Sequence, residues 1–214
     1  MTARIQTLGE EIANSVSHGF GLLAALLAVP LLLVVTAQHG AAINIVGVSI
    51  FAATLLALYA VSTIYHALPE GRAKRVFLKL DHAAIFVFIA GCYTPFALGP
   101  LRGELGWSLL AAVWGLATVG VTLKALNRLA HPWVSTALYL LMGWLVVIAI
   151  KPVMDAISVR GLIWLVAGGL SYTIGVVFYA WHRLPYAHPI WHLFVLAGSV
   201  FHYCAIFFYV LPVR

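Results

Sequence analysis

The sequence predicts an all-α fold, a bundle of seven helices that crosses a membrane. Of its 214 residues, 64% are hydrophobic and only 8% are charged, whereas soluble domains carry about 25% charged residues. The mean hydropathy is +1.04, and the apolar residues form seven runs, each approaching the roughly 20 residues that span hydrocarbon. Water therefore cannot be the solvent for most of the surface, and the class is a polytopic membrane protein.

Each predicted span is an apolar run bounded by a short polar connection. The first three connections are QHGAA, LPEGRAKRVFLK and GPLRGE. Short connections make neighbouring helices antiparallel, and no soluble domain or linker interrupts them, so 1–214 is expected to form a single membrane domain. The predicted spans are 19–38, 43–66, 82–99, 105–126, 134–151, 161–181 and 189–211.

Basic residues in the connections predict the orientation. The face that holds the N-terminus carries eight of them and the opposite face carries four, and positively charged connections are usually cytoplasmic. We expect a cytoplasmic N-terminus, an external C-terminus and a location in the cell (inner, cytoplasmic) membrane. The net charge of +6 does not indicate nucleic-acid binding, because the few basic residues belong to these connections. The eight are Arg4, Arg72, Lys74, Arg75, Lys79, Lys124, Arg128 and Arg183, and the four are Arg102, Lys151, Arg160 and Arg214.

Ionisable residues gather at the cytoplasmic ends of four predicted spans. Alternating spans place the start of the first, the end of the second and the starts of the third and seventh on one face. Ionisable groups are costly at membrane depth, so they usually face the bundle interior and mark a function. The four stretches are EEIANSVSH, the SxxxH that ends at His66, the DH that begins at Asp81, and the HPIWH that begins at His188.

Three histidines of this group are spaced for a metal ion. His188 and His192 are four residues apart, so they share a helix face. His66 can supply a third imidazole, and three protein ligands with an open position are typical of catalytic zinc. One turn earlier, Ser62 reaches the periphery of this site. Asp81 returns to the same depth after a basic loop, where it could hydrogen-bond a metal-bound water or orient a ligand imidazole.

Other interpretations stay open for each of these residues. The histidines could merely contact headgroups or carbonyls at the membrane interface. The Asp81 carboxylate could lie at a helix N-terminus, where the helix dipole stabilises a negative charge. The Ser62 hydroxyl could hydrogen-bond a carbonyl of its own helix. Pro189 disfavours a helical conformation at His188, which could therefore lie at the helix cap. We expect the stripe of Glu11, Asn14 and His18 to close the cytoplasmic mouth by hydrogen bonding rather than to bind the ion.

The motifs together resemble the hemolysin III branch of the progestin and adipoQ receptor superfamily. They are SxxxH, KLDHAAIF, GCYTPF and HPIWH, with EEIANSVSH in the first span, and they cover essentially the whole chain. The resemblance implies a seven-helix bundle with zinc (Zn²⁺) held near the cytoplasmic face by His66, His188 and His192. It also implies that Ser62 and Asp81 lie beside the metal-bound water.

The resemblance extends to adiponectin receptors and alkaline ceramidases, which suggests zinc-dependent hydrolysis of a lipid amide or ester. A membrane lipid is then the expected substrate or ligand, and the bacterial branch is linked to membrane lipid homeostasis as well as to a hemolytic phenotype. The alternative is a non-enzymatic sensor or receptor-like regulator, in which zinc only clamps the last span to the second and third. A pore-forming hemolysin is less favoured, because secreted pore formers are normally soluble beforehand and this chain cannot be.

Overall fold

The computed structural model describes residues 6–129 and 132–210, and every regular element in those ranges is a helix. Seven helical segments are long and apolar enough to cross a membrane, and the fifth of them, Trp133–Ala156, combines three shorter helices. The predicted all-α, seven-span fold is therefore confirmed. The elements are α1 Leu8–His39, α2 Ala42–Ala67, α3 Arg72–Leu98, α4 Glu104–Ala125, α5 Pro132–Gly143, η1 Leu145–Ala149, α6 Ile150–Ala156, α7 Val159–Ala180 and α8 Ala187–Tyr209.

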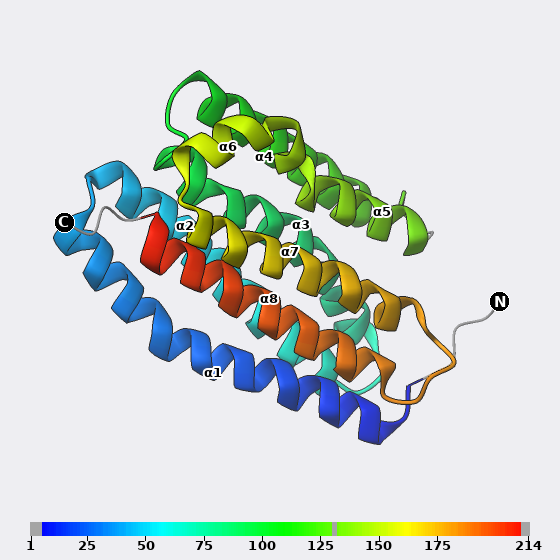
Figure 1. Ribbon diagram of the computed structural model, residues 1–214. Coiled ribbons are helices and arrows are strands. Elements are labelled where there is room, and N and C mark those ends of the chain that lie inside the picture. The colour runs from blue at the N-terminus through cyan, green and yellow to red at the C-terminus, as the bar shows by residue number, and fades with distance from the viewer. Residues whose placement is uncertain (1–5, 130–131, 211–214) are drawn as a thin grey trace.

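The first four helices pack in chain order, α1 on α2, α2 on α3 and α3 on α4, and α8 closes the bundle by packing against both α7 and α1. Figure 1 shows α1 and α8 running in parallel from the same end of the bundle. The predicted cytoplasmic location of that end stays a prediction. Two of the basic residues on which the predicted orientation rests, Arg4 and Arg214, lie outside the described residues.

The bundle is apolar on its outer surface and holds polar side chains inside. In α1, Leu27 is 81% exposed, whereas Asn14 and His18 are buried at 0% and 4%. The apolar core is centred on side chains such as Leu32 and Phe51, which are fully buried. This distribution reverses that of a soluble protein, because lipid tails solvate leucine and cannot solvate a polar group.

The first helix begins well before its predicted span at 19–38. Thr7 and Glu10 form a capping box: the Thr7 hydroxyl accepts from the Glu10 N–H at 3.3 Å, and the Glu10 carboxylate accepts from the Thr7 N–H at 2.8 Å. A capping box satisfies two of the free donors that begin a helix. The polar turns around Glu11 and Asn14 are therefore continuous with the apolar part of α1.

The last helix begins at Ala187, so His188 lies within its first turn and not at the cap. Tyr186 takes the left-handed conformation with φ 58° and redirects the chain into the helix. Pro189 is then in the first turn, where a helix tolerates proline because the missing N–H would have no partner within the helix. His188 and His192 consequently share a helix face.

The fifth span is not one continuous helix, which the apolar run at 134–151 did not indicate. The chain leaves α-helical geometry after Gly143 and continues through η1. The Tyr93 hydroxyl of α3 covers the break, because it lies 3.0 and 2.8 Å from the carbonyls of Met142 and Gly143 and accepts from the Val146 N–H at 3.0 Å. A broken helix is tolerated at membrane depth only where such partners exist.

We expect Tyr93→Phe to lower the free energy of unfolding by about 1–3 kcal/mol, because backbone groups at the break of the fifth span lose their partner where no water can replace it. The measurement is thermal or denaturant unfolding in detergent. The matched control is Tyr209→Phe, because the Tyr209 hydroxyl has no hydrogen bond to any described residue, and its effect should stay below about 0.5 kcal/mol. Equal losses in the two variants would contradict the role of the Tyr93 hydroxyl.

Candidate metal site

A cavity of about 400 Å³ lies between the helices, with side chains of α1, α2, α3, α5, α7 and α8 on its walls. Its polar end contains His66 and Asp81, and its walls also include Phe88, Trp191 and the deeper His202. His202 follows His192 by ten residues, which corresponds to about 15 Å along a helix. The cavity therefore joins an ionisable end to a largely apolar and aromatic interior.

The three predicted metal ligands meet at the polar end of this cavity. Each of His66, His188 and His192 offers a ring nitrogen, and these atoms lie within 4.8 Å of one another. The ring centroids of His188 and His192 are 4.7 Å apart. The ring centroid of His66 lies 5.2 Å from that of His188 and 5.1 Å from that of His192. Zn–N distances of about 2.0–2.1 Å place two nitrogens of one ion at most about 4.2 Å apart, so the three imidazoles would have to move closer together to share an ion.

One ring nitrogen of this cluster lacks the partner that burial normally requires. The Nε2 atom of His66 is buried and has no hydrogen bond to any described residue, while its Nδ1 atom lies 2.6 Å from the Glu11 carboxylate. An orphaned polar atom at such depth is costly. A divalent ion bound by three imidazoles would satisfy it, so the residues present fit a metal of the kind that imidazole prefers.

Ser62 lines the cavity one turn before His66 and binds another helix rather than its own. Its hydroxyl oxygen lies 2.7 Å from Nδ1 of His18 in α1. The His18 ring stacks on that of His192, with a centroid distance of 3.5 Å and an interplanar angle of 9°. The back-bonding alternative for Ser62 is therefore wrong, and α1 connects the serine to a predicted ligand.

Asp81 lines the same cavity but is not part of the histidine cluster. Two expectations about its surroundings are wrong. The basic stretch RAKRVFLK is the start of α3 and not a loop, because α3 begins at Arg72. Asp81 consequently lies more than two turns inside the helix, too far from the N-terminus to interact with the end of the helix dipole. A carboxylate at this depth faces the cavity instead.

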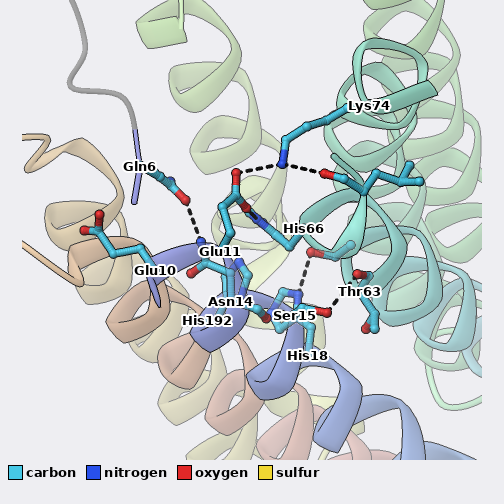
Figure 2. A network of polar contacts seen from close by, with 12 residues as sticks. Gln6, Glu10, Glu11, Asn14, Ser15, His18, Thr63, His66, Lys74 and His192 are labelled. Atoms are coloured by element: carbon cyan, nitrogen blue, oxygen red, sulfur yellow. Dashed lines mark hydrogen bonds and ion pairs between the residues drawn. The ribbon is translucent and has the colours of Figure 1, made fainter. Parts of the chain in front are cut away.

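The polar stripe of α1 makes a hydrogen-bond network that reaches three other helices (Figure 2). The Glu11 carboxylate lies 2.6 Å from Nδ1 of His66 and accepts from Nζ of Lys74 at 2.8 Å. Glu10 accepts from the Tyr186 N–H at 2.9 Å, just before α8. The sequence indicated hydrogen bonding by this stripe, but not that Glu11 would contact a predicted ligand.

Lys74 is the polar partner that the sequence analysis missed. It had been counted only as one of the basic residues that set the orientation, yet it is 7% exposed and donates to the Leu68 carbonyl at 3.1 Å as well as to Glu11. Its position in the RAKR stretch resembles that of its exposed basic neighbours. Lys74 differs from them because α3 packs against α2 and the Lys74 side chain reaches Glu11 of α1.

The fold and site together define a membrane protein with seven helical segments that can span a membrane and a three-histidine cluster beside a cavity between the helices. The sequence model of the family described as "Haemolysin-III related" matches residues 6–203. The chain is 41% identical to "Hemolysin-3" of Bacillus cereus, over 99% of this chain and 97% of that protein. It is 42% identical to the "Hemolysin-3 homolog" of Bacillus subtilis (strain 168), over 97% of each chain.

A more distant similarity extends to animals. The chain is 31% identical to the human "Monocyte to macrophage differentiation factor", over 95% of this chain and 85% of that protein. The match to the family model covers nearly the whole chain and agrees with the two bacterial similarities. The protein belongs to the haemolysin-III family.

We expect Glu10→Ala to lower the free energy of unfolding by about 1–2 kcal/mol. The substitution removes an N-terminal capping partner of α1 and the acceptor for the Tyr186 N–H. The measurement is thermal unfolding in detergent. Glu104→Ala is the matched control, because Glu104 is also in the first turn of a helix but is exposed. An equally large loss of unfolding free energy in the control would contradict a stabilising contact between Glu10 of α1 and the backbone just before α8.

Proposed function

We propose that this protein is a zinc-dependent hydrolase that acts on a lipid amide or ester and contributes to membrane lipid homeostasis. The observation that carries the proposal is the meeting of three imidazoles, a carboxylate and a hydroxyl at one end of an apolar cavity within a membrane bundle. A structural metal needs only the imidazoles. The cavity beside them provides room for a reacting molecule.

His66, His188 and His192 would hold the ion, and the buried Nε2 of His66 would gain its missing partner. When bound, zinc would activate a water molecule and polarise an acyl carbonyl. Three protein ligands leave a coordination position open for this chemistry. The ligands come from α2 and α8, so the packing of those helices determines the geometry of the site.

Asp81 and Ser62 are the two further groups of the proposed reaction. The Asp81 carboxylate would take a proton from the attacking water and deliver it to the leaving amine or alcohol, first as base and then as acid. The Ser62 hydroxyl lies 2.7 Å from Nδ1 of His18 and also makes a hydrogen bond to the Asp81 carboxylate. When a substrate is present, the Ser62 hydroxyl would turn from that carboxylate and donate its hydrogen bond to the oxyanion that develops on the carbonyl oxygen.

The cavity supports a lipid as the substrate. Its volume of about 400 Å³ falls within the roughly 300–1,000 Å³ that is typical of small-molecule sites. Aromatic and aliphatic side chains such as Phe88 and Val195 line it away from the histidines. An acyl chain would occupy this interior, while the amide or ester group lies at the histidines and the headgroup lies near the end of the bundle.

A sensor or receptor-like regulator with a structural metal is the second candidate. It is favoured by the division of the three histidines between α2 and α8, because an ion there would tie two helices that are far apart in the chain. Such a clamp gives Asp81 no chemical task. Chelation would then lower the unfolding temperature, and the loss of the Asp81 charge would have no effect on function.

We expect purified wild-type protein to hold about one zinc ion per chain and the double variant His188→Ala/His192→Ala to hold none. The measurement is metal analysis by mass spectrometry of protein in detergent. His39→Ala is the control, since His39 is an exposed histidine at the far end of α1. A folded wild type that stays metal-free after zinc is offered would refute the metal site.

We expect Asp81→Asn to lower the turnover of a lipid amide or ester about 100-fold or more, because it removes the proton acceptor, while metal content stays unchanged. Asp155→Asn is the control, because Asp155 is exposed. The assay offers a panel of amide and ester lipids to zinc-loaded protein. Absence of turnover by the wild type across that panel would reject the hydrolase and leave the sensor.

A further inference from the structure

Glu11 and Asn14 of the polar stripe of α1 have no task in the proposed reaction, although they lie against the metal site. Neither residue belongs to the histidine cluster. The Glu11 carboxylate instead contacts Nδ1 of His66 (Figure 2), and the Asn14 carbonyl lies near Nδ1 of His192. Groups in that position can determine which ring nitrogen is available to an ion.

Glu11 selects the tautomer of His66. The distance from Nδ1 of His66 to Oε2 of Glu11 is 2.6 Å. An ionised carboxylate can only accept a hydrogen bond, so Nδ1 carries the hydrogen and Nε2 of the neutral ring keeps its lone pair. Nε2 is the buried atom without a partner. The contact therefore presents the ligand atom to the cluster and fixes the orientation of the ring.

Lys74 holds Glu11 in that position. Its Nζ donates to Oε1 of Glu11 at 2.8 Å and to the Leu68 carbonyl at 3.1 Å. Lys74 and His66 thus use different oxygens of one carboxylate, whose side chain is 17% exposed. The charge of Lys74 compensates that of Glu11 at a depth where an unpaired carboxylate would be costly. The chain of contacts runs from α3 through α1 to α2.

α1 also selects the tautomer of His192. Nδ1 of His192 lies 3.2 Å from the Asn14 carbonyl and 3.0 Å from the Ser17 hydroxyl. The Ser17 hydroxyl donates to that same carbonyl at 2.8 Å, so its oxygen is left to accept. A carbonyl also only accepts, so Nδ1 of His192 carries the hydrogen and Nε2 is free for an ion. Two ligands on two helices are therefore set by one helix.

We infer that α1 is the outer support of the metal site, and that Glu11 and Lys74 are positioning residues that determine the affinity of the site for its ion. The inference rests on the proposed metal site but not on hydrolysis. Glu11 acts through His66, and Lys74 acts through Glu11. Groups that orient ligand histidines in this way typically contribute 10–100-fold to metal affinity.

The test is the affinity of the purified full chain for Zn²⁺, measured by competition with a chromophoric chelator. Glu11→Gln keeps the shape of the side chain but loses the charge, and it should weaken zinc binding about 10–100-fold. Glu70→Gln and Lys79→Met are the controls, because both residues are exposed and lie near Lys74 in the chain. Both controls should bind zinc as the wild type does.

A double-mutant cycle tests the order of the contacts. Lys74→Met should also weaken zinc binding, and Glu11→Gln/Lys74→Met should bind no more weakly than Glu11→Gln alone, because Lys74 acts only through the carboxylate. Fully additive losses would overturn the chain from Lys74 to His66. Where Glu11→Gln does not fold, Ser17→Ala provides the second measurement, and it should weaken zinc binding through His192.

A merely structural role makes a different prediction. Thermal unfolding of the metal-free protein would then fall in Glu11→Gln while the zinc affinity stays within twofold of wild type, and that result overturns the inference. The proposed metal site fails separately. A wild type that binds no zinc overturns both claims, whereas a wild type and a Glu11→Gln variant with equal affinities overturn only the role of α1.

Discussion

The structure depends on one constraint: inside hydrocarbon no water is present to satisfy a polar group, so each must find its partner within the protein. Continuous helices meet the constraint for most of the backbone. Where the fifth span breaks, the Tyr93 hydroxyl supplies the missing contacts. Where side chains are ionisable, they gather at one end of the bundle and bind one another, as Glu11, Lys74 and His66 do.

This constraint gives the four helices at that end separate tasks. α2 and α8 bring the three imidazoles together. α1 brings the acceptors that face two of those rings, and α3 brings both the lysine that holds Glu11 and the aspartate on the cavity wall. The closure of the bundle by α8 against α1 is therefore more than packing. It places His192 against Asn14, which is far away in sequence.

Membership of the haemolysin-III family agrees with this arrangement without deciding its chemistry. The chain covers 97% of the length of each of the two Bacillus proteins compared with it, so the similarity is not confined to one part of the sequence. The word hemolysin in their names describes lysis of cells. The features of this chain are a histidine cluster and a cavity between the helices beside it.

Much was predictable from sequence because it depends on local pattern. Apolar runs of sufficient length must be helical in a bilayer, and spacing of three or four residues places His188 with His192 and Ser62 near His66 on shared helix faces. Alternation of the spans also brought the right four helix ends together. The same reasoning failed at the start of α3, where the charges of RAKRVFLK suggested a loop and the structure has a helix.

Only the tertiary structure decided which polar groups are partners. Hydropathy does not distinguish the buried Lys74 from the exposed Arg75 beside it, because rotation and depth of α3 relative to α1 separate them. Local sequence likewise does not indicate that Glu11 contacts His66, that His18 contacts Ser62, or that Tyr93 contacts the break of the fifth span. The sequence by itself determined the spans and the residues capable of metal binding, since these follow from composition and local spacing. The contacts that orient those residues arise from helix register and packing, which local spacing does not encode.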